Sequence, residues 1–405
     1  MFDTMFTTGE RERHRIKSLD GLRALAIALV IAFHTLITFY LAARKGVTIM
    51  VFGSMHVTWF FMNCWTGVNL FFVLSGFLIA KQLVDIFSEP PAWHGILLAR
   101  YARKRFCRIA PAYYVVTIPS LLTMHGMHGI PHVEWPFVLA TYVLFMQDYF
   151  YQTLLQQLWS LGVEVKFYII APALVMLIGK MRLNARYLTL GTIIIILLLV
   201  KIIVAWAIPP VTSEPSYVVN FRTPFHMSLD SLIAGVAACF LWHDERFRRL
   251  LNAPLVANVL FAAGTLSFVF LCAFTTPHYL RYPEPVTLFS ETFFFTFVSA
   301  SFAAMLLGLL GPCAIAPLFA SWPVRIVAEL SYSLYLVHLL FVNMALRFAH
   351  DSIPNPSNQT MLWCSSIICL LVYAMPIAAI IYVCVERPIN RWAHKPTRIR
   401  AESSK

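Results

Sequence analysis

The chain has 405 residues, of which 59% are hydrophobic and 12% are charged, whereas an ordinary soluble domain has about 25% charged residues. The hydrophobic residues fall in blocks of ~17 to 25, each long enough to cross ~30 Å of hydrocarbon, which excludes a soluble enzyme. The net charge of +12 comes from Lys and Arg in short segments beside these blocks, so it indicates membrane topology and contact with a lipid bilayer rather than nucleic-acid binding.

The pattern predicts an all-α, polytopic membrane protein with ten crossing helices. In chain order, the expected spans are 19–43, 66–86, 109–124, 160–179, 187–208, 224–243, 254–274, 286–310, 325–348 and 360–384. A further apolar stretch, Pro136 to Tyr149, is short for a crossing and fits a re-entrant or interfacial segment. The chain therefore divides into a cytoplasmic N-terminal segment (1–18), one membrane domain (19–384) and a basic cytoplasmic tail (385–405).

The orientation follows from the connecting segments, because Lys and Arg accumulate on the cytoplasmic side of a membrane. Ten spans with both termini inside place 22 of these cations inside and 4 outside. The four outer cations are Arg44, Lys45, Arg222 and Arg281. Counting Pro136 to Tyr149 as a crossing would put the cation clusters 103–108 and 180–186 on opposite faces, so ten spans is the better count.

Arg23 and His34 are the ionisable residues of the first span after Asp20, and such residues cost at least ~2.5 to 3.5 kcal/mol deep in a bilayer. They are eleven positions apart, which brings them within ~20° of one helix face and ~16 Å apart along the axis. An Arg near the inner mouth can bind phosphates, and an uncharged imidazole deeper in can act as a general base. Each alone also fits a structural role, with Arg23 snorkelling and His34 bonded to a neighbouring helix.

Three later sites have polar residues in or beside an apolar span. Arg105 and Arg108 share a helix face at the inner entrance of the third span, where phosphate binding and topology explain them equally well. Glu164 lies about one turn inside the span that follows Trp159, and a carboxylate there needs a partner or a task. His338 is a second intramembrane imidazole, for which structural and catalytic roles are equally open.

Taken in order, these motifs resemble the motif set of the acyltransferase-3 family of bacterial inner-membrane proteins. The set comprises Arg23 with His34, the stretch 67–79, Arg105-x-x-Arg108, Trp159-Ser160-Leu161 to Glu164, Ser331 to His338, and Glu386-x-Pro388. The resemblance covers the chain from about residue 18 to 390, and the ordered set is far more specific than any single motif. The chain departs from the commoner family motif after Glu164, where it has Val165 and Lys166.

The resemblance implies ten transmembrane helices in the bacterial inner membrane and an acyl-CoA donor, with acetyl-CoA favoured, taken from the cytoplasm. It implies transfer of the acyl group to a hydroxyl of a cell-surface glycan or related carbohydrate, without a metal. It makes His34 the catalytic base and gives Glu164 and His338 further roles in the core site. The resemblance also implies that Arg23, Arg105 and Arg108 bind the donor or line its entrance.

A mechanism follows from this resemblance as a hypothesis. The ~16 Å rise from Arg23 to His34 is about the reach of an extended pantetheine arm, so a nucleotide held by Arg would bring its thioester beside the imidazole. His34 would deprotonate the acceptor hydroxyl, and the alkoxide would attack the thioester. Direct transfer and an acyl-histidine intermediate are both open. Because the chain ends 17 residues after Pro388, we expect it to lack the SGNH-type domain of some relatives.

Other residues have weaker functional interpretations. His226 and Asp230 have the HxxxD spacing of soluble acyltransferases, which here is more simply a coincidence, although Asp230 could orient an acceptor hydroxyl. Trp159 belongs to the aromatic residues near span ends, most of which are interfacial, but it could stack on a sugar. A further group, His125, His128 and His132, has metal-like spacing, but the intervening Gly and Pro favour turns.

Two other functional classes compete with acyl transfer. A transporter or flippase of a polar or lipid-linked substrate would also need intramembrane Arg, Glu and His, but it predicts interrupted helices in matching positions of two repeats, and none is found. An interaction scaffold is disfavoured because the charged motif set is intact. The acceptor stays open between a surface glycan and a small natural product such as a macrolide.

Overall fold

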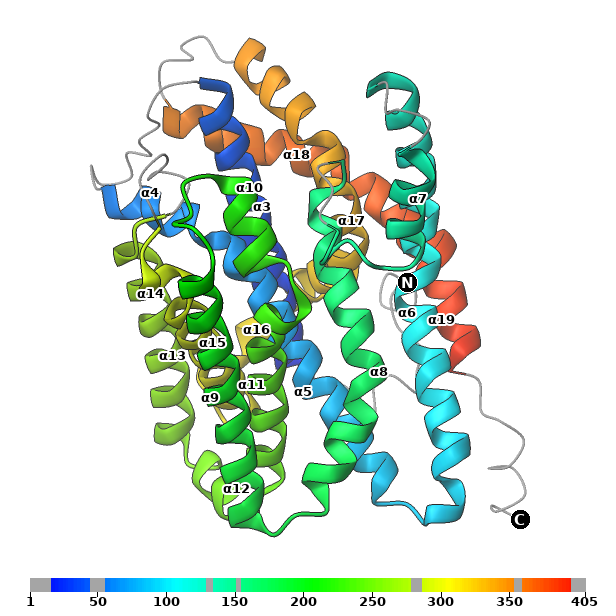
Figure 1. The fold of residues 1–405 in the computed structure, drawn as a ribbon, viewed down its shortest axis with the longest axis vertical. Helices are drawn as coiled ribbons and strands as arrows, with labels where there is room; N and C mark the ends of the chain where they lie inside the picture. Colours follow the sequence, from blue (N-terminus) through cyan, green and yellow to red (C-terminus); the bar gives the residue numbers. More distant parts are fainter. Residues whose placement is uncertain are drawn as a thin grey trace.

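The computed structural model describes residues 16–43, 55–128, 134–150, 154–277, 286–352 and 359–394, and every regular element in these ranges is helical. The long helices form one bundle (Figure 1). The first half contains α3 (Ser18–Ala43), α4 (Met55–Met62), η1 (Cys64–Thr66), α5 (Gly67–Phe87), α6 (Pro91–His128), α7 (Trp135–Val143), η2 (Gln156–Leu158), α8 (Trp159–Gly179) and α9 (Leu183–Ala207). The second half contains α10 (Glu214–Tyr217), η3 (Val218–Arg222), α11 (Phe225–His243), α12 (Glu245–Leu251), α13 (Pro254–Phe274), α14 (Leu288–Glu291), α15 (Phe293–Leu310), α16 (Ala316–Phe319), α17 (Trp322–Ser352), α18 (Gln359–Ile381), η5 (Tyr382–Glu386) and α19 (Arg387–Ala393).

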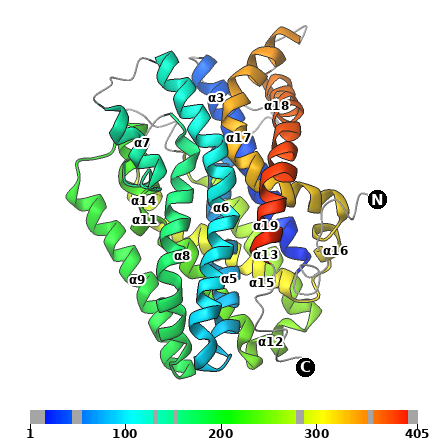
Figure 2. The ribbon, with the colours of Figure 1, turned by 90° about the vertical axis from the view of Figure 1, so that its right-hand side faces the viewer.

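Nine helical segments of the described chain are long and apolar enough to cross a membrane, one fewer than the sequence predicts. The difference is the expected span 109–124, which is the second half of α6. The first half of this 38-residue helix carries a cluster of cations, and its apolar half is shorter than the ~20 residues of a typical crossing. Figure 2 shows α6 running over the height of the bundle beside α8, so its length is that of a crossing helix although its composition is not.

The stretch Pro136 to Tyr149 forms the short helix α7 and a turn. The nine residues of α7 span only ~13 Å, and Phe145 just beyond it has a left-handed backbone with φ of 55°. A helix of this length cannot cross ~30 Å of hydrocarbon. Several residues used to set the orientation lie outside the described residues: 1–15, 395–405, Arg44, Lys45 and Arg281.

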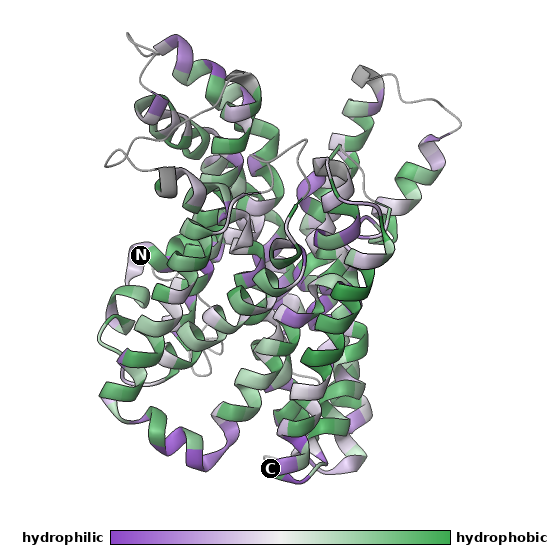
Figure 3. Cartoon of the chain, turned by 60° about the vertical axis from the view of Figure 1, so that its left-hand side comes forward, coloured by the Kyte–Doolittle hydropathy of each residue, from purple (hydrophilic) through white to green (hydrophobic). Residues whose placement is uncertain are grey.

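The outer surface of the bundle is apolar. Large side chains on the peripheral helices are exposed, including Ile203 (64%) and Trp206 (80%) of α9 and Ile368 (63%) of α18. Figure 3 shows mostly hydrophobic residues along the long helices, with hydrophilic residues at helix ends and in places inside the bundle. Such a surface is unfavourable in water and favourable in hydrocarbon, and helices satisfy their own backbone hydrogen bonds there.

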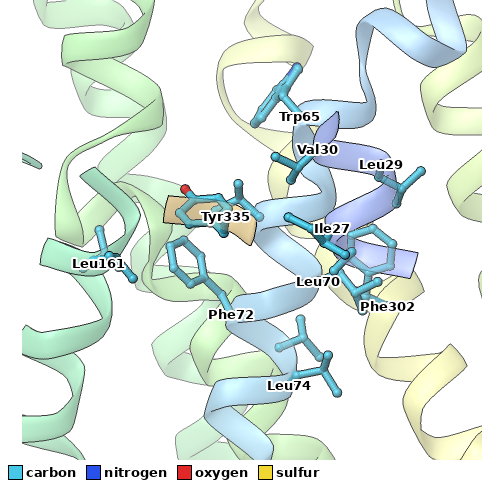
Figure 4. Packing of buried hydrophobic residues seen from close by; sticks show 14 of the residues in the cluster. Ile27, Leu29, Val30, Trp65, Leu70, Phe72, Leu74, Leu161, Phe302 and Tyr335 are labelled. Carbon is cyan, nitrogen blue, oxygen red and sulfur yellow. The ribbon is translucent and has the colours of Figure 1, made fainter. Parts of the chain in front are cut away.

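Helix α5 lies at the centre of the bundle and packs against α3, α8, α11 and α15. Figure 4 shows its side chains reaching in both directions, with Leu70 near Ile27 of α3 and Phe72 near Leu161 of α8. The contact with α11 is the closest, because a Cβ added at Gly76 would meet the backbone of Leu232, and one at Gly235 would meet the backbone of Val73. Small residues let membrane helices approach in this way.

Replacing Gly235 by Val should therefore push α5 and α11 apart. We expect Gly235→Val to lower the free energy of unfolding by about 1–3 kcal/mol, as overpacking does elsewhere. Gly191→Val in α9 is the matched control, because nothing lies within 4 Å of a Cβ at that position. Unfolding of both purified variants in mixed micelles measures the difference. Equal stability of the two variants would contradict the close crossing.

Candidate functional site

Two histidines that are distant in the sequence meet inside the bundle. Nε2 of His338 on α17 lies 3.2 Å from Nδ1 of His34 on α3, and the ring centroids are 4.9 Å apart. His338 is fully buried, whereas His34 is half-buried and keeps some accessible surface. The pair forms where α3 and α17 pack against each other along much of their length.

The hydrogen-bond partners assign the protons of the two rings. Nδ1 of His338 lies 2.8 Å from the carbonyl oxygen of Tyr335, which can only accept, so this nitrogen is the donor and Nε2 carries the lone pair. Nδ1 of His34 therefore faces two acceptors, this Nε2 and the carbonyl oxygen of Val30 at 2.9 Å. It must carry the proton, which leaves the lone pair of His34 on Nε2, as a general base requires.

Tyr335 fixes the turn of α17 that precedes His338. Its hydroxyl lies 2.5 Å from the carbonyl oxygen of Gln157 and 2.6 Å from Oγ of Ser160. The side-chain amide of Gln157 donates in return to the carbonyl oxygen of Leu336 at 3.1 Å. These bonds tie the start of α8 to α17 and hold His338 in register with His34.

Glu164 is held by hydroxyl groups rather than by a cation. Its Oε1 accepts from Ser75 Oγ at 2.5 Å and from the Tyr168 hydroxyl at 2.6 Å. The guanidinium of Arg105 lies over the Tyr168 ring at 5.6 Å and donates to the side chain of Gln82 on α5. The structure thus brings Glu164 and Arg105 into one polar cluster between α5, α6 and α8.

Arg108 lies against η5, the π-helix that follows α18. Its guanidinium is 3.8 Å from the carboxylate of Glu386, which also accepts from Ser333, and it lies 5.9 Å from the Tyr332 ring. Glu386 ends the π-helix η5, a wider turn that is frequent at functional sites. The charge of Arg108 is therefore partly balanced by a buried carboxylate.

Arg23 and His34 lie near one face of α3, ~16 Å apart along its axis, because the helix is unbroken between them. Its guanidinium forms an ion pair with Asp20 at 2.9 Å, and the Arg23 side chain is partly accessible whereas that of Asp20 is buried. Asp20 therefore shares the face on which the sequence predicts phosphate binding.

Asp230 and His226, which share the HxxxD spacing, have different surroundings. Asp230 accepts from Nζ of Lys201 at 2.7 Å and from Thr296 at 3.1 Å, and both charged side chains are 1% exposed. Nδ1 of His226 instead lies 3.2 Å from the hydroxyl of Tyr149. The carboxylate of Asp230 is thus engaged in a buried ion pair among α9, α11 and α15.

Two cations of this region escape the sequence reasoning. Lys201 lies in an otherwise apolar span. Because a charged residue is costly inside a bilayer, its presence there could have predicted a buried acidic partner. In the topology predicted from the sequence, Arg222 is a cation of an outer loop. In the structure its side chain is only 6% exposed and lies beside Trp65 and Trp159. Trp159 is itself buried and packs edge-to-face on Phe72.

His125 is the one residue of the candidate histidine cluster whose side chain the structure describes. Its ring stacks on that of Trp135 at 4.3 Å with an interplanar angle of 14°. The side chains of His128 and His132 lie outside the described residues. In the part of the chain that is described, no group of three or more His, Cys, Asp or Glu could hold a metal ion.

Comparison with known proteins gives one family. A family model described as an acyltransferase domain matches residues 16–383. The chain is 25% identical over 365 residues to "Peptidoglycan O-acetyltransferase OatA" of Listeria monocytogenes, covering 87% of this chain and 53% of the relative. It is 24% identical over 396 residues to "Putative peptidoglycan O-acetyltransferase YrhL" of Bacillus subtilis, covering 94% and 56%. The chain thus spans about half the length of the curated relatives it matches, and no solved structure matches it.

Lys201 and Asp230 allow a direct test of the buried ion pair. Lys201→Met leaves a carboxylate unpaired in an apolar interior, so we expect it to lower the free energy of unfolding by about 3–5 kcal/mol. The double variant Lys201→Met with Asp230→Leu should recover most of that loss, because no charge is left without its partner. Thermal unfolding in detergent measures these two variants and the single variant Asp230→Leu. Losses that simply add would show that the two side chains are not coupled.

Proposed function

Because this chain belongs to the acyltransferase-3 family, whose domain model covers residues 16–383, we propose that it is a membrane-bound O-acyltransferase. The donor is acyl-CoA, with acetyl-CoA favoured, and the acceptor is a hydroxyl of a cell-surface carbohydrate. Two relatives are named as peptidoglycan O-acetyltransferases, which supports a glycan acceptor and an acetyl group. The observation that carries the proposal is the His34 imidazole, oriented by His338 so that its lone pair lies on Nε2.

A line of partly accessible side chains supports a route for the donor. Arg105, Tyr168, Glu164 and Ser75 lie within the bundle, and each keeps some accessible surface. Along α5, Gln82 contacts Arg105 and Phe71 lies 6.2 Å from the Tyr335 ring, next to the histidines. These two residues are eleven positions apart on one helix, or ~16 Å. That separation suits a donor with its phosphates at Arg105 and its thioester at His34.

The cations Arg105, Arg108 and Arg23 suit the anionic end of the donor. The guanidinium of Arg105 lies 5.5 and 5.6 Å from the rings of Tyr101 and Tyr168, and no carboxylate of the described residues forms an ion pair with it. Arg108 and Arg23 each have an acidic partner, Glu386 and Asp20, so their net pull on phosphate is weaker. We therefore assign the main phosphate contact to Arg105 and supporting roles to the other two.

His34 performs the proton transfer in this mechanism. Its Nε2 takes the proton of the acceptor hydroxyl, and the oxygen attacks the thioester carbonyl carbon. The C–S bond then breaks, the CoA thiolate leaves, and the proton passes from the imidazolium to that sulfur. His338 does not touch the reacting atoms; it keeps the His34 tautomer in place and is a positioning residue. Glu164, held by Ser75 and Tyr168, would keep the lining of the donor route polar.

Thiol release tests the function and separates it from transport. Protein in proteoliposomes is given acetyl-CoA and soluble glycan fragments, and free CoA and glycan mass are followed together. We expect one thiol and one acetyl ester per turnover, and His34→Ala should slow both by about 10²–10⁴. Full activity of well-folded His34→Ala would refute the assignment. Movement of glycan without thiol release would identify a transporter, and esterification of a macrolide alone would change the acceptor.

Arg105 tests the donor route separately. We expect Arg105→Gln to raise the KM for acetyl-CoA about 10- to 100-fold, since a hydrogen bond to a charged group contributes about 1.5–3 kcal/mol. Arg249→Gln is the matched control, because Arg249 is also an arginine but its side chain is 81% exposed beside Glu245. Steady-state kinetics over a range of donor concentrations give both values. An unchanged KM in Arg105→Gln would contradict phosphate binding at Arg105.

A further inference from the structure

Arg222 is a buried cation that the mechanism above does not use. It ends the π-helix η3 (Val218–Arg222), and Pro224, which lacks a backbone N–H, precedes α11 directly. The Ser228 hydroxyl donates to the carbonyl oxygen of Arg222 at 2.9 Å and so fixes the backbone of this turn. A wide turn held in this way directs the side chain into the bundle, and such turns are frequent at functional sites.

The guanidinium of Arg222 is surrounded by aromatic rings from three different elements. Its centre lies 4.7 Å from the Trp65 ring of η1, 5.7 Å from the Phe33 ring of α3 and 5.9 Å from the Trp159 ring of α8. Cation–π contacts offset part of the cost of removing the charge from water. The three ring contacts hold the guanidinium in place.

This cation lies beside the histidine pair. Phe33 is the residue before His34, and their rings are 5.0 Å apart. The charge of Arg222 interacts with the His34 imidazole and with the Tyr335 hydroxyl. A fixed positive charge next to a general base is unfavourable for an imidazolium. It is favourable for a negative charge that forms beside that base.

We propose that Arg222 stabilises the oxyanion that forms on the thioester carbonyl when the acceptor oxygen attacks it, which makes Arg222 a catalytic residue. This inference rests on the acyl transfer proposed above. Attack turns the carbonyl C=O into C–O⁻, and the electron pair returns when the C–S bond breaks, so Arg222 neither gains nor loses a proton. A preorganised donor in a water-poor site favours the transition state over the bound thioester, and therefore affects kcat more than KM.

Replacing the guanidinium tests the proposal by kinetics. We expect Arg222→Met to lower kcat by about 10²–10³ and to leave the KM for acetyl-CoA within about threefold, and Arg222→Lys to retain more activity than Arg222→Met. Arg186→Met is the matched control, because Arg186 also lies over an aromatic ring, Phe240 at 4.8 Å, but at the other end of α11. A folded Arg222→Met with the kcat of the wild type, alongside an inactive His34→Ala, would overturn only the Arg222 inference.

A second measurement needs no substitution at Arg222. Acetyl-dethia-CoA, a methyl ketone with a methylene in place of the sulfur, binds as the donor but cannot be cleaved. We expect the ketone stretch in the wild-type protein to shift to a lower wavenumber than in water, and to do so in His34→Ala as well. A stretch at or above its position in water would overturn the proposal even if Arg222→Met failed to fold. A wild type without turnover but with the shifted stretch would refute the proposed function alone.

Discussion

The contact between His34 and His338 is the interaction on which the site depends. It joins the first and ninth predicted spans, and its geometry leaves the lone pair of His34 on Nε2. An imidazole alone in an apolar bundle would have no preferred tautomer or orientation. Here the carbonyl oxygen of Tyr335 sets the proton of His338, and the carbonyl oxygen of Val30 together with Nε2 of His338 sets the proton of His34 on Nδ1. The polar bonds of Tyr335 to Gln157 and Ser160 thus help to hold the histidine pair.

Three acidic side chains inside the bundle also have stated partners. Asp230 pairs with Lys201, Glu386 with Arg108, and Glu164 accepts from two hydroxyls. Pairing lowers the cost of charges in a bilayer, so these contacts also hold helices together that have little hydrophobic reason to associate in lipid. The guanidinium of Arg222 lies among three aromatic rings, those of Phe33, Trp65 and Trp159.

The sequence predicted the family, the helical class and the position of most spans, because hydropathy and motif order are local properties; the family model confirms the family. It could not predict which helices face each other. His34 and His338 were both singled out, but nothing in their spacing pairs residues 304 positions apart. Arg222 was misplaced because a polar segment between two spans looks like a loop, whereas a π-helix folds this one inward. The number of candidate spans is nine rather than ten, because α6 is long enough to cross a membrane but its composition is too polar to count.

The tautomer of His34 tests the central claim most directly. In protein labelled with ¹⁵N histidine and reconstituted in lipid, solid-state NMR distinguishes protonated from unprotonated ring nitrogens, and His34→Gln identifies the signals of this residue. The account predicts a neutral ring with its proton on Nδ1, where the Val30 carbonyl oxygen and Nε2 of His338 both accept, and an unprotonated Nε2. A proton on Nε2 of His34 in the resting protein would contradict the account.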